Sequence, residues 1–283
     1  MKESDNKYIS LTGEEEDKRL ELQNKGLYCF DHDIYRKTFE QYENPAVLDI
    51  GCGMGKMIHG MLRDIPAYRL FGVDEAARQI DLAKKTFPSG NFYNLNVESG
   101  SFFENIKEIM RANEISGFDV VNCSMVILHL KDPVGILSEI RSILSKKGTL
   151  IIRDIDDGIH FVWPDDEDIF RKYYEVCARD TRLGDRHCGR KLFYYLKKAG
   201  FSKICLEKQG LSTADLEDKM ILFEMFIPTT LHYMEQRYLE SPENEQWKND
   251  YFWFRDNIGK MRKSFEEDEF ISSAGFISFT AKR

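Results

Sequence analysis

Residues 47–57 read VLDIGCGMGKM, and this stretch decides how the rest of the chain is interpreted. A mostly apolar run that contains one acid, Asp49, predicts a buried strand. Three glycines then follow at alternate positions, Gly51, Gly53 and Gly55. Glycines with this spacing let the backbone turn sharply and approach a ligand closely, because no Cβ atom blocks either arrangement. The stretch therefore predicts a ligand-binding turn at the end of a strand.

The composition is that of a globular chain with one large domain, or with one domain and a sizeable insertion. The chain has 283 residues, of which 42% are hydrophobic and 31% charged, and a net charge of −8. This acidity argues against a nucleic-acid partner, which would normally require a basic surface. No apolar run approaches the roughly 20 residues that span a bilayer. The charged N-terminus also lacks the apolar segment of a secretory signal. We therefore expect no membrane partner and a cytoplasmic location.

The six cysteines form no CxxC pair and share no repeated spacing. We therefore expect neither a metal site nor a redox site. Cys52 lies inside the glycine turn, where a reduced and packed thiol is the simplest interpretation.

Apolar strands alternate with single helices through the first half of the chain. The expected strands cover residues 46–50, 68–74, 91–97, 118–128 and 148–156. Such alternation implies right-handed crossovers and a parallel sheet covered on both faces. Ligands of these sheets bind beyond the carboxyl ends of the strands, which is where the glycine turn falls.

The regular alternation stops after residue 156. The pattern there predicts helices over 165–183 and 187–199 and strands over 202–209 and 275–283. Residues 212–265 are aromatic-rich and largely helical by pattern, with interruptions expected at Pro228 and at Ser241-Pro242. Two further helices, over 14–25 and 32–42, are expected before the first strand.

The glycine turn does not fit a dinucleotide site. That fingerprint needs a third glycine five residues after the first, and here the position is Lys56. The pattern Asp49-x-Gly51-x-Gly53-x-Gly55 instead resembles motif I of the class I S-adenosylmethionine-dependent methyltransferases, (D/E)xGxGxG.

The resemblance to this family is strong over residues 45–156 and looser over residues 186–209. Residues 118–130, FDVVNCSMVILHL, are similar to the family pattern FDxVxxxxxLxHL. Residues 144–152, LSKKGTLII, are similar to LKPGGxLxI, with Lys147 in place of a glycine.

The resemblance implies S-adenosylmethionine as cofactor and a set of residues that bind it. The residues expected to contact the part of the cofactor that lies at the glycine turn are Asp49, Gly51, Cys52 and Gly53. Asp74 and Glu75 follow the second strand, where a carboxylate accepts the ribose hydroxyls, although Asp74 as a helix N-cap is the alternative. The remaining expected contacts are Asn96 and Val97 at the adenine, Ser124 and Met125 at the fourth strand, and Tyr8 and Arg19 from an N-terminal cap. Core packing is the alternative for Met125.

Acidic residues at the end of the fifth strand suggest a place for the methyl acceptor. Asp156, Asp157 and His160 are the catalytic candidates, and Asp154 and Trp163 the substrate-binding ones. Buried like charges need a compensating cation, which an amine substrate would supply. A solvated Asp-Gly turn is the alternative.

The alternation of strands and helices predicts an α/β fold with a Rossmann-like, doubly wound sheet, and the resemblance implies seven strands, of which the last is antiparallel. The expected parts are a helical N-terminal cap (1–44), the cofactor-binding core (45–210), a helical insertion or substrate cap (211–266) and the final strand (267–283). The expected function is methylation of a small molecule, and N-methylation of an amine is favoured. The alternatives are O-methylation of a small metabolite, a protein or RNA methyltransferase, and a cofactor-binding protein without catalysis.

Overall fold

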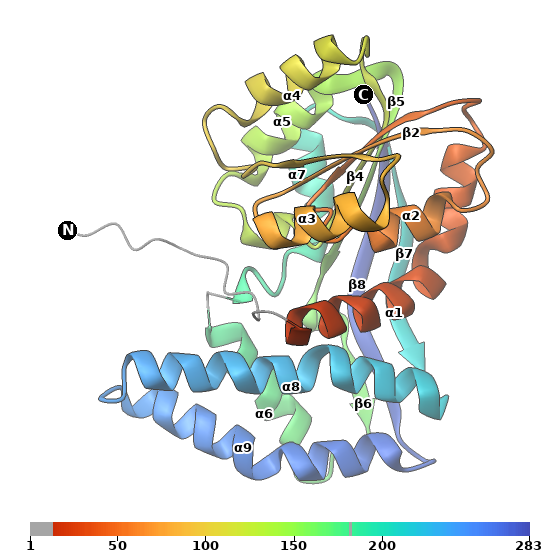
Figure 1. The fold of residues 1–283 in the computed structure, drawn as a ribbon. Helices are drawn as coiled ribbons and strands as arrows, with labels where there is room; N and C mark the ends of the chain where they lie inside the picture. The colour runs from red at the N-terminus through yellow and green to blue at the C-terminus, as the bar shows by residue number, and fades with distance from the viewer. Residues whose placement is uncertain (1–13, 181–182) are drawn as a thin grey trace. The chain divides into compact units, whose positions relative to one another are not determined.

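A computed structural model describes residues 14–180 and 183–283 (Figure 1). The described chain divides into two compact units. The sheet unit contains residues 28–156, 187–209 and 276–283. The helical unit contains residues 14–27, 157–186 without 181–182, and 210–275.

The sheet unit is built on five parallel strands in the order β3-β2-β1-β4-β5. They are β1 (Ala46–Ile50), β2 (Arg69–Asp74), β3 (Asn91–Asn94), β4 (Phe118–Ser124) and β5 (Leu144–Ile155). Their burial explains the near-continuous apolar runs, because both faces of a parallel sheet are covered. The winding direction reverses between β1 and β4, so the turn after β1 lies where such sheets bind ligands.

The final strand, β8 (Ile271–Lys282), pairs antiparallel with β5, as predicted. The strand β7 (Ser202–Thr213) pairs with β8 as well. A three-residue strand, β6 (Phe161–Trp163), pairs with the first residues of β8 inside the helical unit. This strand was not predicted, and it brings the sheet to eight strands.

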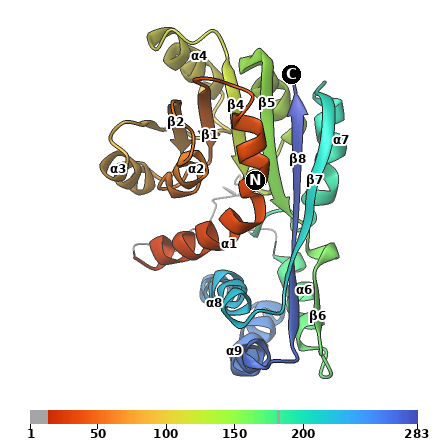
Figure 2. The same cartoon turned by 90° about the vertical axis from the view of Figure 1, so that its right-hand side faces the viewer.

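Helices connect the strands of the sheet unit. They are α2 (Lys56–Leu62), α3 (Ala77–Thr86), α4 (Phe102–Ala112), α5 (Pro133–Ile143) and α7 (Leu192–Lys198), with short 3₁₀ turns at Ile127–His129 and Gly189–Lys191. The second half of α1 (Glu14–Phe39) also belongs to this unit. Figure 2 shows this half of α1 and α7 on opposite sides of β8. The predicted Rossmann-like, doubly wound α/β class is confirmed, with one strand more than expected.

The helical unit is formed by α6 (Ile169–Arg179), α8 (Leu216–Glu240) and α9 (Glu245–Glu266), with a 3₁₀ turn at Asp157–Ile159. Its core is aromatic and includes Phe170, Tyr173, Phe223, Phe254 and Phe265. Residues 157–186 belong to this unit, whereas the sequence-based division placed them with the core.

Two predicted helix interruptions are wrong. The expected gap between residues 25 and 32 is absent, because α1 is continuous. Gly26 allows α1 to approach α8 closely, since a Cβ atom there would lie 3.3 Å from side-chain atoms of Ile221 and Met225. Pro228 lies inside α8, where Ile227 and Thr230 beside it are buried. Packing therefore outweighs the helix-breaking tendency of proline.

The break at Ser241-Pro242 is confirmed, because α8 ends at Glu240 and α9 begins at Glu245. Among the residues that the structure describes, no helix is long and apolar enough to cross a membrane.

Candidate functional site

The glycine turn after β1 has the backbone geometry that its sequence predicts. Gly51, Gly53 and Gly55 have φ angles of 73°, 51° and 74°, a region that residues with a Cβ atom rarely adopt. Gly51 also lies against Val126, because a Cβ atom at residue 51 would overlap the Val126 side chain. Glycine is therefore required at Gly51 for two independent reasons.

The amides of this turn are largely committed inside the protein. Gly51 N and Cys52 N both donate to the carbonyl oxygen of Val73, at 2.9 and 3.1 Å. Gly55 N donates to the carbonyl oxygen of Cys52 at 2.8 Å. The turn is thus tied to the end of β2 and to itself. These amides are not presented to an anion, unlike those of a phosphate-binding loop.

Asp74 joins the turn to the end of β2. One carboxylate oxygen accepts from Gly53 N and the other from Ala76 N, both at 2.8 Å. Ala76 is the N-cap residue of α3, so Asp74 does not occupy the N-cap position. A carboxylate oxygen can accept more than one hydrogen bond.

Glu75 and Asn96 lie beside each other after β2 and β3. The Asn96 side-chain amide donates to the Glu75 carboxylate at 2.8 Å, and the Asn94 amide donates to the Asp74 and Glu75 carbonyl oxygens. Partial burial, followed by the charge of Asp74, raises the pKa of Glu75. Val97 is half-buried directly after this pair.

Met125 leaves β4 in a left-handed conformation, with φ of 59°. Its amide donates to the carbonyl oxygen of Arg153 at 2.9 Å. A non-glycine residue in this region costs about 1–2 kcal/mol, and such residues concentrate at functional sites. The preceding Ser124 hydroxyl accepts from the guanidinium of Arg153. Both residues are half-buried, which is compatible with a contact at their open side.

Asp49, the acid of the glycine stretch, is 2% exposed. Its carboxylate accepts from the Asn122 side-chain amide at 2.6 Å, and the Tyr35 hydroxyl donates to the Asn122 carbonyl oxygen at 2.6 Å. Burial raises the pKa of Asp49 to about 7, and the charge of Asp74 adds to this effect. Asn122 and Arg153 act in the opposite direction.

A buried ion pair lies on the same face of the sheet. Arg153 of β5 pairs with Asp31 of α1, and both side chains are almost wholly buried. Ser278 of β8 donates to Asp31 at 3.1 Å. Sequence reasoning missed this pair and the Tyr35–Asn122 contact. The only signal was a polar residue inside each apolar strand, Asn122 in VVNC and Arg153 in LIIRDI.

The structure supplies cations from the chain to two of the predicted carboxylates. Asp156 is buried and accepts from the Arg190 guanidinium at 2.6 Å and from Arg190 N at 2.7 Å. Asp157 is buried and accepts two bonds from Arg186, at 2.8 and 2.9 Å. The argument that these two carboxylates require a substrate cation is therefore wrong, because internal arginines neutralise them.

Asp154 differs from its two neighbours, because it accepts from neutral donors. These are Leu128 N and Ile155 N, both at 3.0 Å, and the Cys188 thiol. Burial raises the pKa of Asp154 to about 7. Like Asp156, it lies in the sheet unit with the glycine turn.

The remaining predicted site residues lie elsewhere. Asp157, His160 and Trp163 belong to the helical unit, where His160 stacks on Tyr174 and Trp163 is 67% exposed. Arg19 also belongs to the helical unit and donates to Gln23 at 2.7 Å. Tyr8 lies outside the described residues. The roles predicted for all these residues stay predictions.

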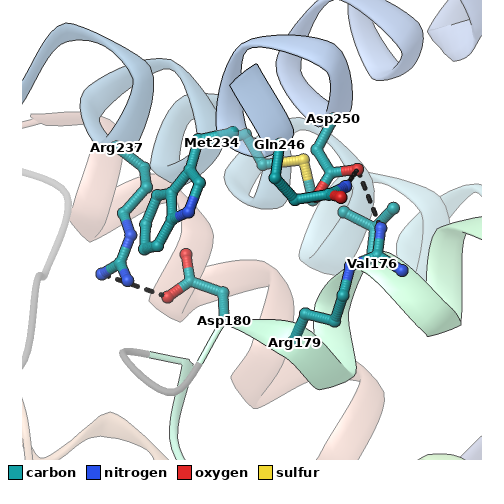
Figure 3. A pocket seen from close by; sticks show the side chains of 8 residues that line it. Val176, Arg179, Asp180, Met234, Arg237, Gln246 and Asp250 are labelled. Carbon is teal, nitrogen blue, oxygen red and sulfur yellow. Dashed lines mark hydrogen bonds and ion pairs between the residues drawn. The ribbon is translucent and has the colours of Figure 1, made fainter. Parts of the chain in front are cut away.

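The helical unit contains a small cavity of about 60 Å³ (Figure 3). Two ion pairs border it, Arg179–Asp250 at 2.8 Å and Arg237–Asp180 at 3.6 Å. Pockets for small organic ligands usually measure about 300–1,000 Å³, so this cavity is too small for a substrate. Within residues 14–180 and 183–283, no group of three His, Cys, Asp or Glu side chains could hold a metal ion.

Residues 42–200, more than half of the chain, match a family model described as "Methyltransferase domain". The chain belongs to this methyltransferase family. The predicted methyltransferase family is thereby confirmed, and the enzyme class and the S-adenosylmethionine cofactor are those of this family.

Individual relatives of this methyltransferase chain are distant. A methyltransferase of Schizosaccharomyces pombe is 26% identical over 116 residues, which are 39% of this chain and 40% of that protein. Demethylmenaquinone methyltransferase of Thermotoga maritima is 24% identical over 113 residues, 40% of this chain and 44% of that protein. The matches thus span less than half of these relatives. The YcgJ protein of Bacillus subtilis shares the fold, with a TM-score of 0.55, 14% identity, and coverage of 90% of this chain and 98% of that one.

Proposed function

We propose that this protein transfers a methyl group from S-adenosylmethionine to a small-molecule acceptor. The observation that carries the proposal is the glycine turn, whose backbone permits close approach while its amides are committed to Val73, Asp74 and Cys52. A dinucleotide pyrophosphate needs free amides at this place, whereas S-adenosylmethionine has no phosphate. Family membership supports the same cofactor.

The residues of the sheet unit fit the parts of this cofactor. Asp74 is proposed to accept the ribose hydroxyls at the end of β2, and Asp49 is proposed to place a negative charge near the cationic methionyl part. Asn96 and Val97 are proposed to contact the adenine. When bound, the cofactor supplies an activated sulfonium methyl group. The chain's own task is to orient the reactants and exclude water.

An amine acceptor is our proposal for the substrate class. Asp156 and Asp157 do not support it through charge, because arginines already compensate them. Asp154 is the remaining acidic candidate at the end of β5, because the donors named above are neutral, but it is wholly buried and must become exposed to meet an acceptor. The net charge of −8 favours a small cationic acceptor over RNA.

Calorimetric titration with S-adenosylmethionine, S-adenosylhomocysteine and NAD tests the cofactor. We expect saturable binding of the first two. The variant Asp74→Asn should bind them at least tenfold more weakly, since it loses a charged hydrogen bond. Asp132→Asn is the matched control, because that carboxylate also accepts a backbone amide, Gly135 N at 2.9 Å, but at the start of α5. Binding of NAD alone would overturn the assignment.

A turnover screen tests the acceptor class. Release of S-adenosylhomocysteine is measured with panels of amines, phenols and carboxylic acids, and with RNA and protein extracts. Turnover with amines supports the proposal, whereas turnover with phenols alone would favour O-methylation. Cofactor binding without turnover on any panel would favour a protein that binds the cofactor without catalysis. A cytoplasmic location is likewise proposed, and fractionation of cells tests it.

A further inference from the structure

A row of buried polar side chains crosses one face of the sheet beneath α1. Asp49 of β1 and Asn122 of β4 are partners in the strand register, so their side chains share that face. Tyr35 of α1 reaches Asn122 from above. All three side chains are at least 98% buried. Because burial removes these groups from bulk solvent, each of them needs a hydrogen-bond partner inside the protein.

The chemistry of the three groups sets the direction of the two hydrogen bonds. The Tyr35 hydroxyl donates to the Asn122 carbonyl oxygen, so the amide nitrogen of Asn122 faces Asp49. An ionised carboxylate only accepts hydrogen bonds, whereas a protonated one also donates. An amide N–H directed at Asp49 therefore favours the ionised form. Without Tyr35, the amide can turn and present its oxygen, which favours a protonated Asp49.

We propose that Tyr35 and Asn122 are positioning residues that keep Asp49 ionised for the positively charged cofactor. The inference rests on the proposed function, because it assumes that S-adenosylmethionine binds at the glycine turn. It adds two residues to the site, one of them from the helix that precedes the first strand.

The surroundings of Asp49 make its charge sensitive to such a contact. Burial and the neighbouring Asp74 of β2 favour the neutral form, whereas Asn122 and the Arg153 cation of β5 favour the ionised form. Arg153 is itself paired with Asp31 of α1, which reduces its effect on Asp49. The thiols of Cys52 and Cys123 and the Tyr35 hydroxyl, whose pKa values are all raised, complete the titratable surroundings. With a pKa of about 7, Asp49 changes charge near neutral pH.

The test compares Tyr35→Phe with the wild-type protein and with Tyr42→Phe. Tyr42 is a matched control, because its hydroxyl also binds inside the sheet unit, to Lys147 and Thr149 at the start of β5. Carboxyl ¹³C shifts of the free protein report the pKa of Asp49 directly, with Asp49→Asn used for assignment. We expect this pKa to rise by about one unit in Tyr35→Phe, the size expected for one lost hydrogen bond, and to stay unchanged in Tyr42→Phe.

Cofactor affinity gives the second readout. A rise of one unit in the pKa of Asp49 lowers the cofactor affinity about tenfold at a pH where Asp49 is protonated in the free protein and must release its proton on binding. The ratio of dissociation constants, variant to wild type, should thus reach several-fold to tenfold near pH 6.5 and return to about one at pH 9. This ratio cancels the titration of the cofactor's own amino group. S-adenosylhomocysteine should show a smaller ratio, because it lacks the sulfonium charge.

The outcomes separate the two proposals. An unchanged Asp49 pKa, or an affinity ratio that is the same at every pH, would mean that Tyr35 is only structural and would overturn the inference. A wild-type protein that does not bind S-adenosylmethionine at any pH would overturn the proposed function instead. Near-ultraviolet circular dichroism checks that each variant is folded. Should Tyr35→Phe not fold, Asn122→Leu removes the same donor to Asp49 and is expected to give the same rise in pKa.

Discussion

Replacing Gly51 with alanine tests the geometry on which the proposed cofactor site depends. Gly51 has φ of 73°, and its Cα faces the side chain of Val126 in the segment after β4. The new Cβ atom would overlap Cγ2 of Val126, well inside the 3.0 Å below which real Cβ contacts hardly ever fall. The substitution therefore combines an unfavourable backbone conformation with a steric overlap.

The two effects have separate magnitudes. A residue with a Cβ atom in the left-handed region costs about 1–2 kcal/mol. An added methyl group in a closely packed place costs about 1–3 kcal/mol more. We therefore expect Gly51→Ala to lower the free energy of unfolding by about 3 kcal/mol. Because the turn must shift to relieve the overlap, cofactor binding should be lost as well.

Urea denaturation of four proteins separates the backbone effect from the overlap. They are the wild type, Gly51→Ala, Val126→Ala and the double variant. Removing Cγ2 leaves only Cβ of Val126, 3.8 Å from the position of the new methyl group, which is an ordinary contact. The double variant should thus regain the overlap share, about 1–3 kcal/mol, relative to the sum of the single variants.

Gly100→Ala is the control, because a Cβ atom there meets nothing within 4 Å. It should change the free energy of unfolding by less than about 0.5 kcal/mol. The reasoning fails if Gly51→Ala is no less stable than Gly100→Ala. It also fails if the four free energies are additive, since additivity would mean that the methyl group and Val126 do not interact.

Three further predictions concern stability. Burial raises the pKa values of Asp49 and Asp154 from 3.8 to about 7. Between about pH 4 and pH 7, the folded protein therefore binds more protons than the unfolded protein. The contribution of these two groups to the free energy of unfolding thus falls as the pH rises through this window. The urea midpoint should decline less steeply with rising pH in Asp49→Asn than in the wild-type protein. Equal slopes in the two proteins would contradict a raised pKa of Asp49. Gly259→Ala in α9 should add about 1 kcal/mol to the free energy of unfolding, because alanine has the higher helix propensity and its Cβ atom would meet nothing within 4 Å. A lower melting temperature of this variant would refute the prediction. Arg190→Gln should lower the free energy of unfolding by about 2 kcal/mol, because it leaves the buried Asp156 without its guanidinium partner. If the ion pair is the cause, this loss should be smaller when Arg190→Gln is made in an Asp156→Asn background.

The parts of the fold that sequence patterns predicted are those that depend on neighbouring residues. Strand β1 and its glycine turn are recognisable because the apolar run and the glycines are contiguous. The break between α8 and α9 is recognisable for the same reason, since Ser241-Pro242 ends a helix locally. Pro228 was misinterpreted because the residues beside it are buried by non-local contacts, such as that of Thr230 with Tyr173 of α6.

The candidate site divides in the same way. Asp74 and Asn96 were predicted as cofactor contacts from the family resemblance and from their places at strand ends, and these roles stay predictions. The sequence did not predict that Arg190 neutralises Asp156, because 34 residues separate them. Gly189 permits that approach, since a Cβ atom there would lie 3.0 Å from Cβ of Asp156.

The sequence by itself determined the alternation of the first five strands with helices, the glycine turn after β1 and the family, because each follows from contiguous residues whose backbone preferences are local. Only the tertiary structure decided the charge environment of the site. Tyr35 and Asn122 are 87 residues apart, and Asn122 and Asp49 are 73 apart. They meet because β1 and β4 align in register under α1. The ionisation of a buried carboxyl depends on these distant partners, since only they replace the water that the fold removes.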